Sequence, residues 1–202
     1  MTKRWAISIM MLLLLSLPAC DSDDKGVWKG DFYLKNNTDM RNISRYSSIT
    51  GDLIIEPQLM DDPLGEFFYL EHTEDGKAIA PMLMLSLSDL ENITRIGGSL
   101  IIRYTSFITL DGLENIETIG KDLVIDRNPI LRRMDGLASL TSVDGSVVIS
   151  KNGTLFSLGM DQLSAIGNDL MVDDNPFLPV SEMERLVEQI GEGNIGGEIT
   201  FQ

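Results

Sequence analysis

The sequence predicts a mainly β protein that winds into a solenoid of stacked parallel strands. Four segments beginning at Ile96, Ile119, Val143 and Ile166 read IGGSLII, IGKDLVI, VDGSVVI and IGNDLMV, at spacings of 23, 24 and 23 residues. The fifth and seventh places of each segment are apolar, as a half-buried strand requires, and Gly, Asp, Asn or Ser precedes them, as at a corner. A repeat of this length cannot bury its apolar face alone, so successive units must stack.

Residues 1–19 are predicted to be a secretory signal peptide rather than part of the fold. A short basic start precedes an apolar run over residues 5–17, and this run is shorter than the ~20 residues that a helix needs to cross a bilayer. The segment Leu17-Pro18-Ala19-Cys20 resembles the bacterial lipobox, in which the cysteine is acylated and the peptide is cut before it. An ordinary signal peptide that ends near a cysteine is the alternative.

Cys20 is the only cysteine of the chain, and acylation explains a lone thiol in an exported protein. Two or more acyl chains hold a protein on a membrane stably. We therefore expect a bacterial lipoprotein whose polar residues 20–27 form a tether. The expected location is the cell envelope, either at the outer membrane and cell surface or on the periplasmic face of the inner membrane.

The formal net charge is −15. The predicted signal peptide contains basic residues and no acidic one, so the mature chain is more acidic still. Nucleic acids and anionic lipids require a basic face, and this charge argues against both as partners. No cofactor motif occurs, and no His/Cys set has the spacing of a zinc site.

The repeat extends over residues 28–202, which we expect to form one domain. Segments beginning at Trp28, Ile49 and Ile195 fit the same register, so that seven strands are predicted. A second apolar pair recurs six and three residues before each start. Its members are Leu90/Ile93, Leu113/Ile116, Leu137/Leu140 and Met160/Leu163. Asparagines follow three of the strands, at Asn128, Asn152 and Asn175, and stacked units would place their amides in a hydrogen-bonded column.

Residues 56–86 interrupt the repeat, because Ile49 and Ile96 lie 47 residues apart. The segment is either an insertion or a degenerate coil. Two apolar stretches, residues 67–70 and 78–80, flank the turn dipeptide Asp75-Gly76, which predicts a β-hairpin arm. Insertions in solenoids often carry binding, so Phe67, Phe68, Tyr69 and His72 are a candidate partner-binding patch. In the alternative, these aromatic side chains pack back on the coils.

The ends of a solenoid must be covered, because they expose apolar surface and unpaired strand edges. Ser181-Glu182-Met183-Glu184 has the form of a capping box and predicts a C-terminal helix to about Ile190, ended by Gly191. A shorter helix capped by Thr38 or Asp39 is expected at the other end.

The runs GDLII and LSDLENITRIGGSLIIRYTSFITLDGLENIETIGKDLVIDRNPILRRMDGLASL resemble the receptor L-domain repeat, over roughly residues 28–202. The resemblance implies a right-handed, leucine-rich-repeat-like β-helix, and it is specific for the repeat rather than for a function. Receptor L domains usually carry cysteines at their ends, and this chain has none there.

Catalysis would have to come from aspartates that share columns of the solenoid. Asp31, Asp52, Asp122 and Asp169 occupy one predicted column, and Asp126 and Asp173 another. Such carboxylates could bind calcium or act as acid and base, but corner aspartates more often accept backbone N–H groups. We therefore predict a non-catalytic module that binds a protein or a glycan. A structural spacer or assembly subunit is the alternative, and a carbohydrate-active enzyme is the third reading. The oligomeric state is left open.

Overall fold

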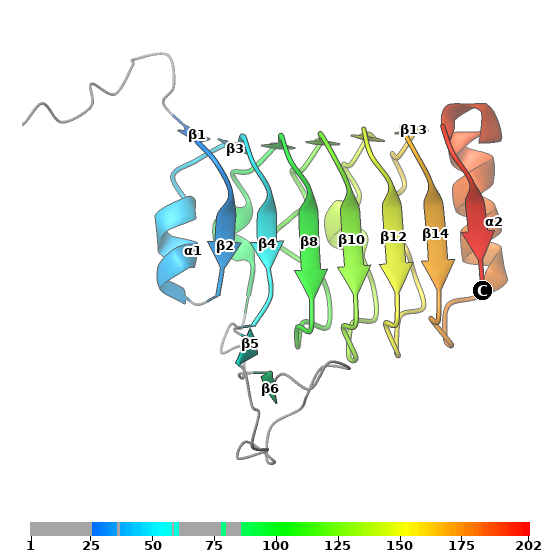
Figure 1. Cartoon of the computed structure of the whole chain (residues 1–202), viewed down its shortest axis with the longest axis horizontal. Helices are drawn as coiled ribbons and strands as arrows, with labels where there is room; N and C mark the ends of the chain where they lie inside the picture. Colours follow the sequence, from blue (N-terminus) through cyan, green and yellow to red (C-terminus); the bar gives the residue numbers. More distant parts are fainter. Residues whose placement is uncertain (1–25, 36, 58, 61–77, 80–85) are drawn as a thin grey trace, which may run out of the picture.

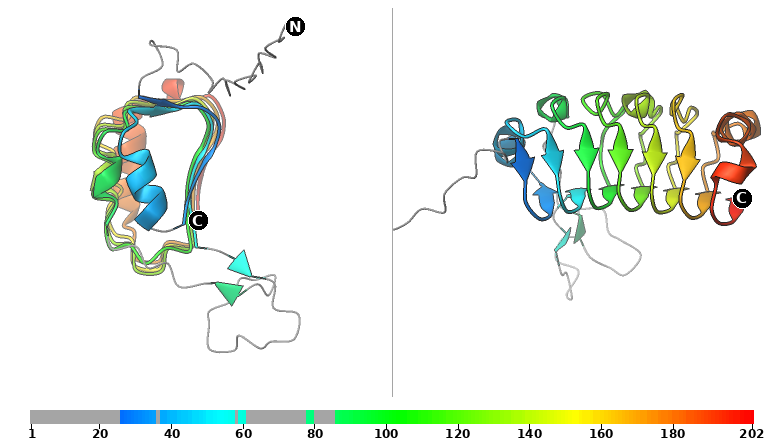
Figure 2. Two further views of the ribbon diagram at one scale, coloured as in Figure 1. Left: turned by 90° about the vertical axis from the view of Figure 1, so that its left-hand side faces the viewer. Right: turned by 90° about the horizontal axis from the view of Figure 1, so that it is seen from above.

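The protein is a β-solenoid whose coils stack along one axis (Figure 1). The computed structural model describes residues 26–35, 37–57, 59–60, 78–79 and 86–202. Each complete coil contributes a strand to a large parallel sheet, a short strand to a small parallel sheet, and a helical or irregular third side. Seen along the axis, the coils lie one behind another with the two sheets on adjoining sides (Figure 2).

The large sheet confirms the seven predicted strands. They are β2 (Phe32–Leu34), β4 (Leu53–Ile55), β8 (Leu100–Arg103), β10 (Leu123–Asp126), β12 (Val147–Ser150), β14 (Leu170–Asp173) and β15 (Ile199–Phe201). Neighbours pair in parallel in this order. Leu100, Leu123, Val147 and Leu170 are register partners, and none has solvent-exposed surface. They form one interior column of the core.

The first residue of each of the first six repeats belongs to a second sheet, which the sequence did not predict. This small sheet consists of β1 (Val27–Trp28), β3 (Ser48–Ile49), β7 (Arg95–Ile96), β9 (Thr118–Ile119), β11 (Ser142–Val143) and β13 (Ala165–Ile166). Its strands have two residues each, too few to show an alternation of apolar and polar side chains in the sequence.

The third side contains short helices and carries the second apolar pair of the repeat. Its elements are α1 (Asn37–Ile43), α2 (Val180–Ile190) and the single 3₁₀ turns η1 (Ser88–Leu90), η2 (Asp135–Leu137) and η3 (Glu192–Asn194). The predicted second apolar pair occurs in four repeats, and all eight of its residues are fully buried. The interior is therefore filled from all three sides, which is how a chain without disulfides can hold this shape.

The interruption of the repeat is an insertion and not a further coil. Strand β4 pairs directly with β8, with Leu53 opposite Leu100, although 47 residues separate them in sequence. Outside the coils, β5 (Leu59–Met60) and β6 (Ala78–Ile79) form a small antiparallel sheet. Residues 78–79 therefore pair with residues 59–60, whereas residues 67–70 of the predicted hairpin lie outside the described residues.

The C-terminal helix forms as predicted, but without the predicted capping box. Helix α2 begins one residue before Ser181, and its N-cap is Pro179, which cannot cap through a side-chain hydrogen bond. The Glu182 carboxylate instead accepts the backbone N–H of Leu158 at 3.1 Å, one coil earlier. Gly191 ends the helix with φ 79°, and its N–H donates to the carbonyl of Val187.

A ladder of buried asparagines confirms the predicted amide column. Each Oδ1 accepts a backbone N–H from the coil before it. Asn152 Oδ1 accepts the N–H of Asn128 at 3.1 Å, and Asn175 Oδ1 accepts the N–H of Asn152 at 3.0 Å. The ladder starts at Thr105, whose N–H and hydroxyl both donate to Asn128 Oδ1. A buried backbone group without a partner is costly, so this column fixes the bend after each strand.

Candidate functional site

The outward face of the large sheet carries a continuous row of mostly apolar side chains, which we call the outer row. Register pairing places its seven members side by side, one from each strand. They are Tyr33, Ile54, Ile101, Val124, Val148, Met171 and Thr200. The exposed fraction is 48% for Tyr33 and 42% for Met171. Ile54 is buried, with 9% exposed, and the other four members are half-buried. No labelled helix or strand covers this face (Figure 1).

A polar row runs beside the outer row, two residues further along each strand. Arg103 donates from Nε and Nη2 to Glu56 Oε2, at 3.2 and 2.9 Å. Asp126 accepts the hydroxyl of Ser150 at 2.8 Å and is ion-paired with Arg127. These side chains already have partners within the protein, so they form a fixed polar border to the apolar face.

Four residues with left-handed backbone follow the strands and end the face. They are Tyr104, Arg127, Lys151 and Asp174, with φ between 50° and 56°. Non-glycine residues adopt this conformation rarely, and here it directs the next residue of each coil into the buried Thr/Asn column. The Arg127 guanidinium lies 5.8 Å from the centroid of the Tyr104 ring. This edge therefore presents a mixture of charges.

The predicted aspartate column is a corner column that satisfies backbone groups. In chain order its members are Asp31, Asp52, Ser99, Asp122, Ser146, Asp169 and Glu198. Asp122 Oδ1 accepts the N–H of Ser146 at 2.8 Å, and Asp169 Oδ1 accepts the N–H of Glu198 at 2.8 Å. A serine coil separates these two aspartates, and the Oδ1 atom of each accepts a backbone N–H of the next coil.

The corner column also determines where glycine precedes it. After an aspartate coil, the next coil has glycine just before the column, as at Gly51, Gly98, Gly145 and Gly197. A Cβ at Gly145 would lie 2.3 Å from Asp122 Oδ1. After the serine coils of Ser99 and Ser146, the same place holds Lys121 and Asn168. The shorter serine leaves room for a side chain, so neighbouring coils are matched in sequence.

Asp126 and Asp173 occupy the second predicted column, with Ser150 between them. Asp126 is buried and engaged as described above. Within the described ranges, no group of three or more His, Cys, Asp or Glu side chains is arranged to hold a metal ion. The carboxylates of Asp126 and of the corner aspartates Asp31, Asp52, Asp122 and Asp169 thus have structural contacts.

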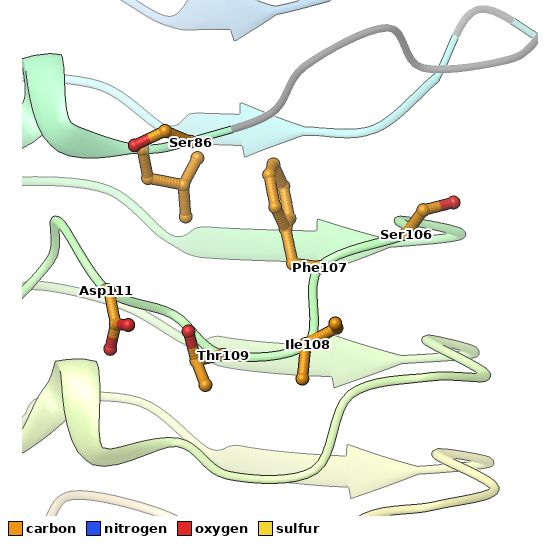
Figure 3. Close-up of a pocket in the computed structure, with 7 residues that line it drawn as sticks. Ser86, Ser106, Phe107, Ile108, Thr109 and Asp111 are labelled. Atoms are coloured by element: carbon orange, nitrogen blue, oxygen red, sulfur yellow. The ribbon is translucent and has the colours of Figure 1, made fainter.

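A depression of about 370 Å³ lies on the third side, next to the point where the inserted segment rejoins the coils (Figure 3). Phe107 and Ile108 line it from one coil and Ser86 and Leu87 from the coil before. Its other lining groups include Asp111 as the one ionisable side chain. Among the described residues, no histidine or second carboxylate lines the depression beside Asp111.

The predicted functional residues of the insertion and the anchor are not placed by the structure. Phe67, Phe68, Tyr69 and His72 lie outside the described residues, and so does Cys20. Within the part of the chain that is described, no helix is long and apolar enough to cross a membrane. The arm patch and the lipid anchor therefore stay predictions.

Comparison with protein families identifies the fold described above. The family model of the receptor L domain matches residues 47–190. The chain belongs to the receptor L domain family. Comparisons with curated proteins and with solved structures gave no match. Membership of this family indicates a ligand-binding module.

Sequence reasoning missed the outer row, although its signal was present. In a half-buried strand the sixth place of each repeat should be polar, yet it is Ile101, Val124, Val148 and Met171 in the four regular repeats. The fifth and seventh places, from which the strands were predicted, fill the core. The apolar sixth place indicates that the outward face is also meant to be covered.

Proposed function

We propose that this receptor L domain is a lipid-anchored, non-catalytic recognition module of the bacterial cell envelope, and that it binds a protein ligand across the outer row. The observation that supports this most directly is the apolar row itself. Soluble proteins rarely leave a continuous apolar strip uncovered unless it binds something, and parallel sheets are usually covered on both faces.

The size and chemistry of the face favour a protein over a glycan. Seven strands spaced about 4.8 Å apart give a strip about 30 Å long, which is long enough to run across a standard protein interface of about 800 Å² per partner. The members between Tyr33 and Met171 are aliphatic, and aliphatic side chains provide area but no hydrogen bonds for sugar hydroxyls. Burial of such surface stabilises a complex by roughly 25 cal/mol per Å² before the costs of association.

The lipid anchor is proposed from the sequence that precedes the first coil. Cys20 ends the lipobox-like segment, and β1 begins at Val27, so only a short polar stretch separates the lipidated residue from the first coil. This arrangement would hold the N-terminal end of the solenoid near the membrane and leave the large sheet accessible. Replacement of Cys20 by Ser should move the protein from the membrane fraction to the soluble fraction, with loss of the acyl mass from its N-terminus.

The binding face is tested by capture of partners from intact cells with labelled protein. The double variant Val148→Lys/Met171→Lys places two charges on adjacent strands of the outer row. The matched control, Ile108→Lys/Phe156→Lys, makes the same chemical change on the third side, where these residues are 54% and 44% exposed. We expect at least a tenfold loss of capture for the first variant alone.

Equal capture by both folded variants would refute the outer row as the binding face. Deletion of residues 60–82 separates the arm patch from the sheet: loss of capture by this variant alone would assign binding to the arm. Turnover of a polysaccharide that disappears in Asp126→Asn or Asp173→Asn would overturn the non-catalytic assignment.

A further inference from the structure

The two ends of the solenoid are finished differently. In the rows that continue the core of the large sheet, Phe32 and Leu34 at the N-terminal end are 6% and 0% exposed. Their counterparts in the last strand, Ile199 and Phe201, stay partly exposed. All members of these rows between the two ends are buried, so among the described residues of these rows the apolar side chains are least covered at the C-terminal end.

Aromatic rings and side-chain hydrogen bonds close the N-terminal end. The Trp28 ring packs edge-on against Phe32, with ring centroids 5.0 Å apart. Trp28 Nε1 donates to the carbonyl of Asp31, and the N–H of Lys35 donates to Asp39 Oδ2. These bonds occupy one peptide group just before β2 and one just after it. The outer edge of β2 is therefore less able to pair with a further strand.

The last strand, β15, has an edge that could accept another strand. The residues that flank β15 bond to β14 and to the residue after β14. The carbonyl of Glu198 accepts the N–H of Leu170, the N–H of Gln202 donates to the carbonyl of Val172, and the carbonyl of Gln202 accepts the N–H of Asp174. Alternate residues of a strand direct their peptide groups to opposite sides, so the groups of Ile199 and Phe201 point away from β14. The large sheet has no described strand on that side.

A groove of about 430 Å³ lies between this edge and helix α2, and we call it the C-terminal groove. Its floor consists of Val187, Ile199 and Phe201, all partly buried apolar residues. Its border carries three exposed carboxylates. They are Glu184, Glu188 and Glu192. Within residues 86–202, none of the three is ion-paired with a basic side chain.

We propose that the C-terminal groove binds an extended basic peptide segment, which adds a strand to β15. The free peptide groups of Ile199 and Phe201 require an extended chain, because a helix satisfies its own backbone groups. Apolar side chains of the segment would cover Ile199 and Phe201, and Lys or Arg side chains would reach the glutamates. A second copy in the same groove would bring two acidic borders together, and like charges at close range are unfavourable.

This inference does not depend on the function proposed for the outer row. The groove is at the end of the stack and uses the edge of the sheet, whereas the outer row uses its face. The mode is strand addition, in which main-chain hydrogen bonds supply affinity and side chains supply selectivity.

The test uses the full chain and the synthetic peptide acetyl-Arg-Thr-Ile-Ser-Val-Thr-Arg-amide, with binding followed by NMR titration. Its counterpart with Glu in place of both Arg residues is the charge control. We expect the basic peptide to bind at least tenfold more tightly than the acidic one, and to slow hydrogen exchange at the amides of Ile199 and Phe201. Equal affinity for the two peptides would overturn the proposal.

Two further comparisons test the site and the mode. Glu188→Lys should weaken the basic peptide roughly threefold to tenfold, whereas Glu117→Lys, an equal charge change on an exposed residue in another part of the solenoid, should not. In a parallel alignment, the orientation of all the other strands of the large sheet, N-methylation of the peptide serine should abolish binding and N-methylation of its isoleucine should not, because only alternate N–H groups face β15. An antiparallel alignment would reverse these two effects. Equal effects within either pair would refute strand addition at this edge.

Discussion

The matching of neighbouring coils at the corner column leads to a quantitative prediction for Gly145→Ala. The added Cβ would lie 2.3 Å from Asp122 Oδ1 and 2.7 Å from the carbonyl carbon of Lys121, both closer than real Cβ contacts. Overpacking of this kind costs about 1–3 kcal/mol. The carboxylate would also have to leave the N–H of Ser146, and a lost hydrogen bond to a charged group costs about 1.5–3 kcal/mol. We expect a total of about 3 kcal/mol.

A second substitution should restore part of this loss. Asp122→Ser by itself should cost about 1 kcal/mol, because a serine Oγ accepts the same backbone N–H weakly, as Ser99 does from Asp122 at 3.4 Å. In the double variant the carboxylate is absent, and the methyl group takes a place that is occupied by side chains after the two natural serine coils. The double variant should therefore be about 1–2 kcal/mol more stable than the sum of the single changes predicts.

The assay is equilibrium unfolding in urea, followed by far-ultraviolet circular dichroism, for the parent, both single variants and the double variant. Gly153→Ala is the matched control, because its added Cβ would meet only the carbonyl oxygen of Pro129, at 3.8 Å. That change should stay within about 0.5 kcal/mol. Simple additivity in the cycle, or a loss at Gly145 as small as at Gly153, would show that the corner explanation is wrong.

Three further predictions concern buried hydrogen bonds and the cap. Asn152→Leu leaves the buried N–H of Asn128 and the carbonyl of Ile125 without their partner and should cost about 3–5 kcal/mol in urea unfolding; a cost near 1 kcal/mol would contradict the ladder. Burial raises the pKa of Glu182, but the N–H of Leu158 and the Arg185 guanidinium outweigh it and lower the pKa below its ordinary value of 4.5. Glu182→Gln should therefore be less stable than the parent at pH 7, with the difference shrinking as the pH falls below about 4.5; a difference that is constant with pH would refute this. Gly191→Ala forces φ 79° on a residue with a Cβ and should lower the unfolding free energy by about 1–2 kcal/mol, whereas an unchanged midpoint would show that the helix end can relax.

The core could be predicted because its signal repeats at a fixed spacing. Leu100 and Ile102 recur in kind in every coil, and stacking converts that recurrence into columns of contact. The asparagine ladder was predictable for the same reason. Both features depend on residues at equal places in successive units, which a single sequence displays directly.

Features that depend on contacts between unequal places could not be predicted. Glu182 has the spacing of a capping box, yet its carboxylate bonds to the N–H of Leu158, a residue 24 places earlier. The pairing of residues 59–60 with 78–79 likewise joins two short segments that carry no alternation. The outer row differs from these features, because its apolar sixth place was present in the sequence. Its prediction would have needed an interpretation of why the solvent side of each strand is apolar.

The position of the inserted segment has a consequence for how this protein can change. Strand β8 stacks on β4 as though no residues intervened, and the ladder begins only at Thr105, one coil after the point of departure. Exchange of the segment between Pro57 and Ser86 for a shorter, longer or unrelated sequence would thus leave every rung and every buried amide in place. The solenoid therefore has an insertion site at which the loop sequence can change while the stability of the stacked coils is retained.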